Sequence, residues 1–420
     1  MKSFADPENN TPLFLAWLVT LTVASFYMYE YFLRVLPSVM ISYFVGTFGA
    51  TIDQISQIET SYYWTYVPLQ IFVGTILDIY GVRRPLFIAL SSCIIGNTLF
   101  SFNHGLEWLI LGRALIGFGS AFGFVAVLKT ANLWLPKKHF PIAIGIATAM
   151  GSFGAIMGKA ATAKMITSFG VTPSMDIITT VGIALTAITF MLVYDRETKF
   201  KTRPKNKKVK SFFKTLSTVL SNSQIWIIGF VGMLLYLPTQ ILGLWDISFL
   251  TSAYKIPPSQ AAMIATSIYW GWIIGSPLVG YISEYIQNKI NIIIFGSIGA
   301  AISLYLLIYH PVHNVNTLSV LLFLLGLFSS VEILVFDLAA NICRRSQTGT
   351  AVAITNMLIM LGGYLQYLIA YVLKSSQSDI GSYSVQAFQS AFSILPLGVI
   401  TALLLSLFIK QPDKRGKIDD

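Results

Sequence analysis

The sequence contains few charged residues for its length. Asp, Glu, Lys and Arg make up 11% of the 420 residues, with a formal net charge of +10, whereas an ordinary soluble domain contains about 25%. Such a chain cannot cover a globular surface with charge. The composition therefore excludes a soluble enzyme and a soluble nucleic-acid-binding protein.

The sequence also lacks the residues that most cofactor sites need. Its two cysteines, Cys93 and Cys343, are too few and too far apart for a CxxC pair, a disulfide framework or a thiolate metal site. The four histidines are not spaced as metal ligands. No glycine-rich loop followed by Lys and Ser/Thr is present to bind ATP phosphates. We expect neither a metal nor a cofactor.

Long apolar runs make up most of the chain. Hydrophobic residues account for 55% of it, and the mean hydropathy is +0.69. Because a helix of about 20 apolar residues crosses a hydrocarbon layer about 30 Å thick, we predict an all-α membrane protein with twelve transmembrane helices. These helices occupy approximately residues 13–44, 60–80, 85–103, 106–131, 141–164, 176–194, 224–247, 260–285, 291–309, 317–340, 348–374 and 385–409.

One long polar segment separates the twelve spans into two sets of six. Between Arg196 and Lys214 it contains nine Lys and Arg, which is typical of a solvated linker with a short amphipathic helix on the membrane surface. We therefore predict an N-terminal six-helix bundle over residues 1–194, a basic linker over 195–223, and a C-terminal six-helix bundle with a tail over 224–420.

The basic residues are distributed unevenly between the two sides of the predicted membrane. Both termini and the even-numbered connections lie on one side, and 21 of the 28 Lys and Arg fall there. Because cytoplasmic loops are enriched in Lys and Arg, we predict that both termini are cytoplasmic. This topology explains the net charge without a nucleic-acid partner. The glycosylation motif Asn9–Thr11 would also be cytoplasmic, which favours a bacterial inner membrane.

The two sets of spans repeat one pattern. Gly74 and Asp78, after the second span, correspond to Gly280 and Glu284, 206 residues later. An offset of 209 aligns the fourth span with the tenth and pairs Gly117 with Gly326, Asn132 with Asn341, and Gly154 with Gly363. We interpret the halves as duplicates of one six-helix unit.

These motifs resemble those of the major facilitator superfamily. GTILDIYGVRR, residues 74–84, is similar to the family signature after the second span, and RALIGFGSAFG, residues 113–123, to the signature in the fourth. The resemblance implies two pseudo-symmetric bundles that rock around a midplane cavity. It implies that the glycine permits close helix contact, that the acid accepts hydrogen bonds at a helix start, and that the arginines clamp the cytoplasmic side. The residues given gating or structural roles in this way are Gly74, Asp78, Gly81, Arg83, Arg84, Arg113, Gly280 and Glu284.

The first span has a second, narrower likeness. FYMYEYFLRVLPSVM, residues 26–40, resembles the Tyr-x-x-Arg-x-x-x-Ser pattern of organic anion/proton symporters in the superfamily, and is also similar to phagosomal amino-acid transporters of intracellular bacteria. The resemblance implies that Tyr31, Arg34 and Ser38 bind substrate, with the arginine on a carboxylate. Ser120 stands where those symporters commonly have a glutamate, so other buried acids become the candidates for proton coupling.

Charged residues inside the predicted spans are functional candidates, because a charge near the bilayer centre costs at least about 2.5–3.5 kcal/mol. Glu30 and Arg34 are four residues apart and share a helix face with Tyr27 and Tyr31. Either they form an ion pair that positions the first span, or Arg34 binds an anion bidentately while Glu30 exchanges a proton. Arg113 either reaches the cavity or supports the first span.

Two acids lie in the tenth span. Glu332 is nearer the middle, and after Glu30 it is the second candidate for proton coupling. Asp337 lies near Arg344 and Arg345 in the sequence, so we expect a gating salt bridge between them. Five residues separate the two acids by about 140° around a helix. We therefore expect that they do not both face the cavity squarely.

Aromatic residues are abundant, with 20 Tyr and 8 Trp. Most are expected at the membrane interfaces or in helix packing, but several lie at the depth of a central cavity. Rings with a few hydrogen-bonding groups would enclose a small solute. The further candidates for solute contact are Tyr27, Tyr66, Gln240, Trp245 and Asn356, the last of which could instead bond another helix.

Together these features predict secondary active transport, in the form of proton-coupled uptake of a small carboxylate-bearing solute such as an organic acid or an amino acid. The expected partners are the solute, a proton and membrane lipid, and the chain is expected to act as a monomer without enzymatic activity. The motifs do not set the direction of transport. Efflux of a metabolite or drug is therefore an alternative, as is a transporter-like sensor that binds its ligand without moving it.

Overall fold

The computed structural model confirms the twelve-helix membrane architecture. It describes residues 5–6, 9–101, 105–136, 139–195, 205–286, 288–310, 314–343, 347–375 and 383–410. Ten spans are long and apolar enough to cross a membrane, and α2 (Ile52–Tyr80) and α3 (Arg83–Ser101) complete the set. The chain is a multi-pass, almost entirely α-helical membrane protein.

Six spans precede the linker. Besides α2 and α3 they are α1 (Leu13–Phe48), α4 (Leu106–Ser120) continued by α5 (Gly123–Trp134), α6 (Phe140–Phe169) and α7 (Val171–Leu192). Ahead of them, β1 (Ala5–Asp6) and β2 (Asn9–Pro12) form a short antiparallel pair that the sequence analysis did not predict.

Six spans follow α8 (Lys205–Leu220), which lies in the linker. They are α9 (Ser223–Tyr254), α10 (Pro258–Ala265) with α11 (Ser267–Tyr285), α12 (Lys289–Tyr309), α13 (Val315–Ser329) with η3 (Ser330–Ile333) and α14 (Leu334–Ile342), α15 (Thr348–Met360) with η5 (Leu361–Leu365) and α16 (Gln366–Ser375), and α17 (Val385–Phe392) with α18 (Ile394–Ser406).

The second span begins earlier than predicted. The sequence analysis placed its start near residue 60, but α2 begins at Ile52 because a capping box precedes it. The Thr51 hydroxyl accepts from the Gln54 amide at 3.4 Å, and the Gln54 side chain accepts from the Thr51 amide at 2.8 Å, which satisfies two amides of the first turn. The polar residues from 53 to 60 are therefore helical, and Glu59 is one of them.

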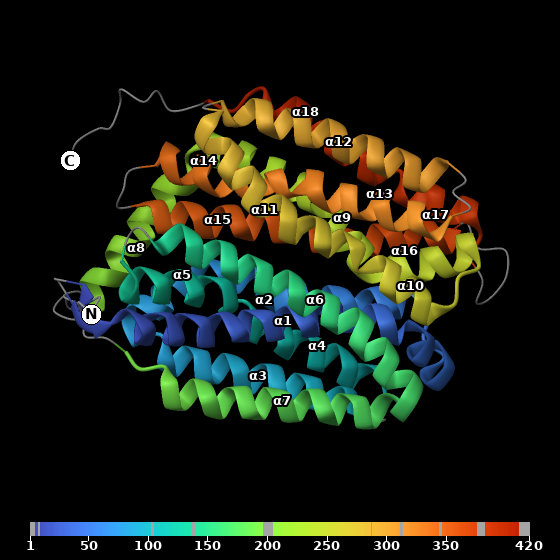
Figure 1. Cartoon of the computed structure of the whole chain (residues 1–420), viewed down its shortest axis with the longest axis horizontal. Helices are drawn as coiled ribbons and strands as arrows, with labels where there is room; N and C mark the ends of the chain where they lie inside the picture. Colours follow the sequence, from blue (N-terminus) through green and yellow to red (C-terminus); the bar gives the residue numbers. More distant parts are fainter. Residues whose placement is uncertain are drawn as a thin grey trace.

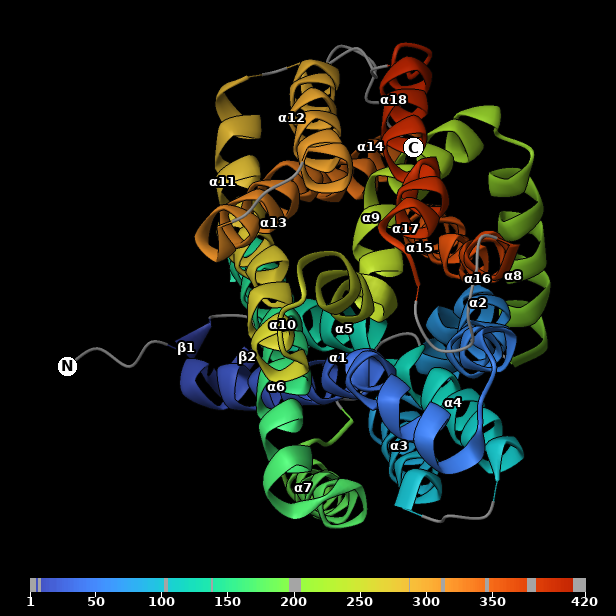
Figure 2. The same ribbon diagram turned by 90° about the vertical axis from the view of Figure 1, so that its right-hand side faces the viewer.

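The two halves are separate groups of helices that meet along one interface. Figure 2 looks along the helices, with α1 to α7 in the lower part and most of the second half above. Across the interface, α1 contacts α9, α2 contacts α15 and α16, and α6 contacts α10 and α11. Many large apolar side chains on the outside of the helices are exposed, among them Phe190, Met191 and Phe295, as expected of surfaces that face lipid.

Two glycines confirm the repeat at the level of helix packing. A Cβ at Gly117 would clash with the backbone oxygen of Tyr62 on α2, and a Cβ at Gly326 would clash with the backbone oxygen of Ile268 on α11. The glycines are 209 residues apart and their contacts 206 residues apart. These are the offsets found in the sequence, so equivalent helices pack in the same way in both halves.

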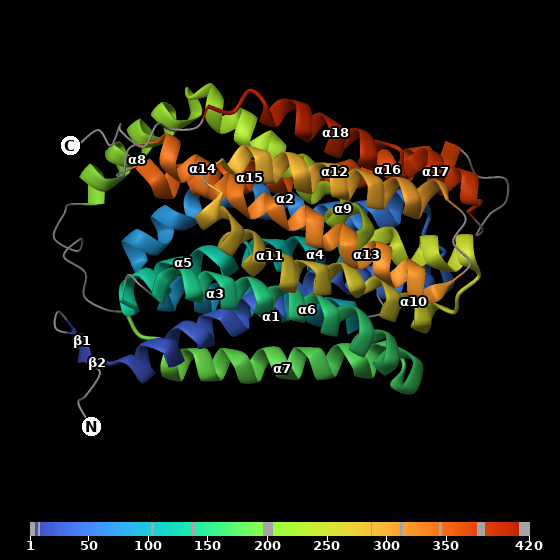
Figure 3. The ribbon, with the colours of Figure 1, turned by 45° about the horizontal axis from the view of Figure 1, so that its top comes forward.

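The start of α1, the end of α18 and α8 all lie at the same end of the molecule (Figures 1 and 3). Successive spans run in opposite directions, so the end of α2 and the start of α3 lie at the same end as the start of α1. The start of α2 lies at the opposite end, which we call the far end.

Candidate functional site

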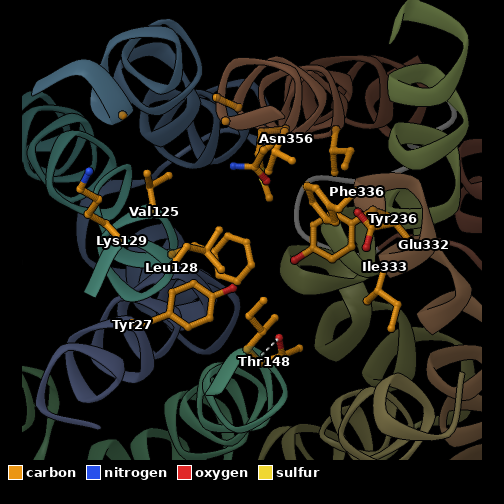
Figure 4. A pocket seen from close by; sticks show the side chains of 18 of the residues that line it. Tyr27, Val125, Leu128, Lys129, Thr148, Tyr236, Glu332, Ile333, Phe336 and Asn356 are labelled. Atoms are coloured by element: carbon orange, nitrogen blue, oxygen red, sulfur yellow. Dashed lines mark hydrogen bonds between the residues drawn. The ribbon is translucent and has the colours of Figure 1, made fainter. Parts of the chain in front are cut away.

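A cavity of about 830 Å³ lies between the two halves. Its inner part is lined by Tyr31, Arg34, Tyr236, Tyr269 and Trp272, near the middle of their spans. From there it extends to a region that we call the mouth, lined by Leu77, Lys129, Asn132, Ala340 and Thr348 at the helix ends opposite the far end. In Figure 4, Tyr27 and Leu128 face Tyr236, Glu332 and Phe336 across the space.

Arg34 is held in the inner wall by three side chains. Its Nε donates to the Tyr62 hydroxyl at 3.0 Å, its Nη2 donates to both carboxylate oxygens of Glu30 at 3.1 Å, and its guanidinium lies 4.1 Å from the ring centroid of Tyr31. Nη1 has no hydrogen-bond acceptor within the described residues. Nη1 is itself buried, so Arg34 retains one buried donor nitrogen that no described residue satisfies.

Glu30 lies behind Arg34 and is fully buried, away from the cavity wall. Its carboxylate accepts from Arg34 and from the Tyr62 hydroxyl at 3.3 Å. Glu30 and Arg34 thus form an ion pair, which was one of the two alternatives predicted for them. The other alternative, an anion bound to Arg34, is also compatible with this geometry, since Arg34 borders the cavity.

Arg113 supports α1 and does not border either cavity. Its guanidinium donates to the backbone oxygens of Leu33 at 3.0 Å and Arg34 at 3.2 Å, and to Glu59 at 2.6 Å. These contacts favour the supporting alternative for Arg113. Glu59 on α2 was missed, because the second span was predicted to begin after it.

The second half contributes hydrogen-bonding groups to the opposite wall. The Tyr236 hydroxyl lies 3.1 Å from that of Tyr31, and Asn356 also borders the cavity. Glu332 borders it from η3 and has no ion-pair or hydrogen-bond partner among the described residues. Asp337 borders it as well. Both acids of the tenth span therefore border the cavity, from positions five residues apart on successive helical segments.

The structure separates the remaining predicted solute contacts into three groups. Tyr27, Tyr31 and Tyr66 line the large cavity. Gln240 borders a second cavity of about 20 Å³ beside Arg34. Ser38 and Trp245 line neither: the Ser38 hydroxyl donates to the backbone oxygen of Val35 at 2.7 Å, and the Trp245 indole donates to Gln366 at 2.8 Å. Both of these side chains pack inside the bundle, in contrast to the expectation.

The repeated motifs lie at the mouth. Gly81 has a φ of 80°, and a Cβ there would clash with Asp195, whose carboxylate accepts from the amides of Val82 at 2.6 Å and Arg83 at 3.1 Å. Arg83 also donates to the backbone oxygen of Phe190 at 2.8 Å, which ties the start of α3 to the end of α7.

Other parts of these motifs differ from expectation. Arg84 is exposed, and the side chains of Asp78 and Glu284 lie outside the described part of the structure. A Cβ at Gly74 or Gly280 would meet nothing within 4 Å. These glycines therefore do not mark close helix contacts in this structure.

Asp337 forms its ion pair with Lys289, at the start of α12, and accepts from Asn341 at 2.9 Å. The sequence analysis expected a salt bridge with Arg344 and Arg345, which lie outside the described residues. Among the described residues, the cation that pairs with Asp337 is Lys289.

At the far end the halves are in contact. A buried ion pair joins Lys159 on α6 to Asp246 on α9, with Nζ to carboxylate oxygen distances of 2.5 and 2.6 Å. An exposed pair joins Lys374 on α16 to Asp53 on α2. The Tyr364 hydroxyl donates to the backbone oxygen of Tyr63 at 3.1 Å. The sequence analysis assigned no role to Lys159, although a lysine within a span needs a partner.

Within the described residues, no group of three or more His, Cys, Asp or Glu is placed to hold a metal ion. The chemistry available to the cavity is therefore that of one arginine, one lysine at the mouth, two carboxylates, hydroxyl and amide groups, and aromatic rings.

Comparison with known proteins places this arrangement in a family. The sequence profile of the Major Facilitator Superfamily matches residues 18–248 and 239–419. The uncharacterized transporter YybO of Bacillus subtilis is 24% identical over 282 residues, covering 61% of this chain and 65% of that protein. The nitrate/nitrite transporter NrtP of a Picosynechococcus species is 39% identical over 92 residues, covering 21% of this chain and 16% of that protein. The alignments span less than two thirds of the length of either relative.

The fold has a counterpart among solved structures. A crystal structure of the nucleoside transporter NupG superimposes with a TM-score of 0.73 at 14% identity, over 94% of this chain and 99% of that one. At this identity the match concerns the fold alone. With the profile match over nearly the whole chain, the chain belongs to the major facilitator superfamily, a family of membrane transporters.

Proposed function

We propose that this protein is a secondary active transporter that moves a small carboxylate-bearing solute by alternating access. The observation that supports this most directly is Arg34, which borders the inner end of the cavity and whose buried Nη1 has no hydrogen-bond partner among the described residues. A guanidinium edge matches a carboxylate, and its hydrogen bonds are strong because both partners are charged. The similarity to the nitrate/nitrite transporter NrtP is in keeping with an anionic solute.

The rest of the cavity suits a small solute whose carboxylate is held by Arg34. Tyr27, Tyr66, Tyr236 and Asn356 would contact it through ring faces, hydroxyls and an amide. The volume of about 830 Å³ falls in the range of small-molecule sites, about 300–1,000 Å³. Glu332 on the opposite wall would stay ionised beside a cationic group of the solute, or exchange a proton.

The proposed orientation follows from the basic residues. With both termini in the cytoplasm of a bacterial cell, the mouth faces the cytoplasm, and the structure represents an inward-open state of a monomer. Proton coupling would rest first on Glu30, because an anion bound to Arg34 weakens the hold of this arginine on the Glu30 carboxylate. Solute and proton would then favour the binding of each other.

The proposed site can be tested on the purified protein with a thermal-shift screen against organic acids, amino acids, sugars and nucleosides, since a ligand that binds the folded state raises its stability. We expect carboxylates to raise the unfolding temperature. Arg34→Lys should weaken that effect strongly, because a point charge does not reproduce the planar fork of the arginine.

Arg84→Lys is the matched control, because Arg84 is exposed and lies outside the cavity. An unchanged carboxylate response in a folded Arg34→Lys protein would reduce Arg34 to a structural role. A carboxylate that binds the protein but does not cross the membrane of proteoliposomes would identify a sensor. Net outward movement of the solute, driven by a pH gradient, would identify an efflux protein.

A further inference from the structure

The buried ion pair between Lys159 and Asp246 is not part of the solute site. Its Nζ lies 2.5 and 2.6 Å from the two carboxylate oxygens, and the side chains are 0% and 2% exposed. Nζ also donates to the backbone oxygen of Leu242 at 3.4 Å, and the Asp246 carboxylate accepts from the amide of Ile247 at 2.8 Å. The pair is well satisfied, and removing one partner would leave the other charged and buried.

The two residues belong to different halves. Lys159 lies in the second part of α6 and Asp246 in the second part of α9, so the pair lies toward the far end, beyond the inner end of the large cavity. Neither residue lines that cavity. If the halves part at the far end, these two side chains must separate.

The groups around the pair connect it to the solute site. The Lys159 ammonium lies 5.9 Å from the ring centroid of Tyr269, and Tyr269 borders both the large cavity and the small one. Glu59, which is paired with Arg113, and Arg34 border the small cavity too. At about 20 Å³ this small cavity has room for one water molecule.

A second ion pair between the halves at the far end offers a contrast. The side chains of Lys374 and Asp53 are 59% and 50% exposed. Exposed pairs contribute little, because water solvates both partners whether or not they are paired. Of these two pairs, we therefore expect the buried one to have the larger effect on the separation of the halves.

We propose that Lys159 and Asp246 are positioning residues of the transport cycle: their ion pair closes the far end, and it must separate before the cavity can open there. This inference rests on the proposed alternating access. A charged pair suits such a contact because each partner is hydrated once the halves part, which offsets part of the lost attraction. An apolar contact of the same size gains nothing from water and would stay closed.

The test uses two reporter thiols in a protein from which Cys93 and Cys343, the only cysteines, have been replaced by alanine. Gly243→Cys reports on the far end, because Gly243 lines the small cavity and a Cβ there would meet only the Tyr269 hydroxyl, at 3.9 Å. Thr148→Cys reports on the large cavity. The measurement is the rate of reaction of each thiol with a charged maleimide in purified protein.

In the parent protein the Thr148→Cys thiol should react and the Gly243→Cys thiol should be protected. Lys159→Met or Asp246→Asn alone should raise the rate of the Gly243→Cys thiol by about tenfold or more, because a lone buried charge opposes closure. The charge-reversed protein, Lys159→Asp with Asp246→Lys, should restore protection. Lys159→Met with Asp246→Leu should protect this thiol at least as well as the parent pair and slow solute exchange.

Two results would overturn the proposal: equal protection of the Gly243→Cys thiol in the parent and in both single variants, or an equal rise in Lys374→Met. If a single variant does not fold, the proposal is tested by labelling the charge-reversed and apolar double variants, which leave no unpaired charge. The labelling needs no knowledge of the solute. A protein without solute exchange would therefore count against the proposed transport, whereas normal exchange with unaltered labelling would count against the role of this ion pair alone.

Discussion

The hydroxyl oxygens of Tyr31 and Tyr236 lie 3.1 Å apart, one on each half of the protein. Both rings border the large cavity and the small one, so this hydrogen bond lies between the solute site and the far end. Tyr31 also contacts the guanidinium of Arg34 through its ring. A solute bound to Arg34 would thus lie next to a contact that joins the halves.

Removing either hydroxyl should loosen the far end modestly. A hydrogen bond contributes about 0.5–1.5 kcal/mol, so Tyr31→Phe or Tyr236→Phe should raise the reactivity of a thiol at Gly243→Cys by about two- to tenfold without unfolding the protein. The double substitution should do no more than either single one, because both remove the same bond. Additive effects would show that the two hydroxyls act independently.

Arg113 should prove structural. In Arg113→Met, the Glu59 carboxylate would remain buried without its cation, and we expect a loss of about 3–5 kcal/mol of stability, seen as a lower unfolding temperature in detergent. Adding Glu59→Gln should recover part of the loss. If Arg113→Met abolished solute binding and left the unfolding temperature unchanged, Arg113 would instead act on the solute.

The repeated glycines should differ in how much stability is lost when each is replaced by alanine, and the sequence motifs do not predict this difference. At Gly117 and Gly326 an added methyl group meets a backbone oxygen that cannot yield, so alanine should cost about 1–3 kcal/mol at each position. At Gly74 and Gly280 the space is open, and alanine in a helix interior should be neutral or stabilising by up to about 1 kcal/mol. Unfolding of the four single variants tests this, and a large loss at Gly74 would contradict the open mouth.

Glu30→Gln should separate exchange from coupling. Glutamine mimics the protonated acid, so exchange of labelled for unlabelled solute should persist while accumulation driven by a pH gradient is lost. Proteoliposomes with and without a gradient provide the measurement. If accumulation survives, Glu30 is not the coupling site. If it also survives in Glu30→Gln with Glu332→Gln, a uniporter or another driving ion becomes the better interpretation.

The orientation can be checked with thiols on the two sides of the membrane. A cysteine at Ser221, next to α8, should be unreachable by an impermeant reagent added outside intact cells, because we expect that end to be cytoplasmic. A cysteine at Asn314, before α13, should be labelled. Both positions are exposed. The reverse pattern would place the mouth on the outside.

The sequence predicted contacts within one helix well and contacts between helices poorly. Glu30 and Arg34 lie four residues apart on one helix, so spacing alone offered their ion pair as one of two alternatives. The pair of Lys159 and Asp246 joins residues 87 positions apart. No periodicity relates these two positions, so the pair could be found only once the positions of α6 and α9 in the fold were known.

The direction of a side chain within the bundle was equally hard to predict. Tyr31 and Ser38 fitted one sequence pattern and lie on nearly the same face of α1, yet only Tyr31 borders the cavity, because Ser38 lies about 10 Å further along the helix, past Arg34 at the inner end of the cavity. Glu59 was within reach of the sequence analysis, since the Thr51 and Gln54 capping box marks the true start of α2.

The interruptions of the spans are distributed unequally, and this has a mechanical consequence. Among the described residues, four spans of the second half are interrupted, at Thr266, η3, η5 and Ser393, whereas in the first half only the span of α4 and α5 is. Backbone hydrogen bonds are weakest at such points, and helices bend there most readily. The second half is therefore the more compliant of the two. The first half, which holds Arg34 and its supporting charges, acts as the stiffer frame against which the second half flexes.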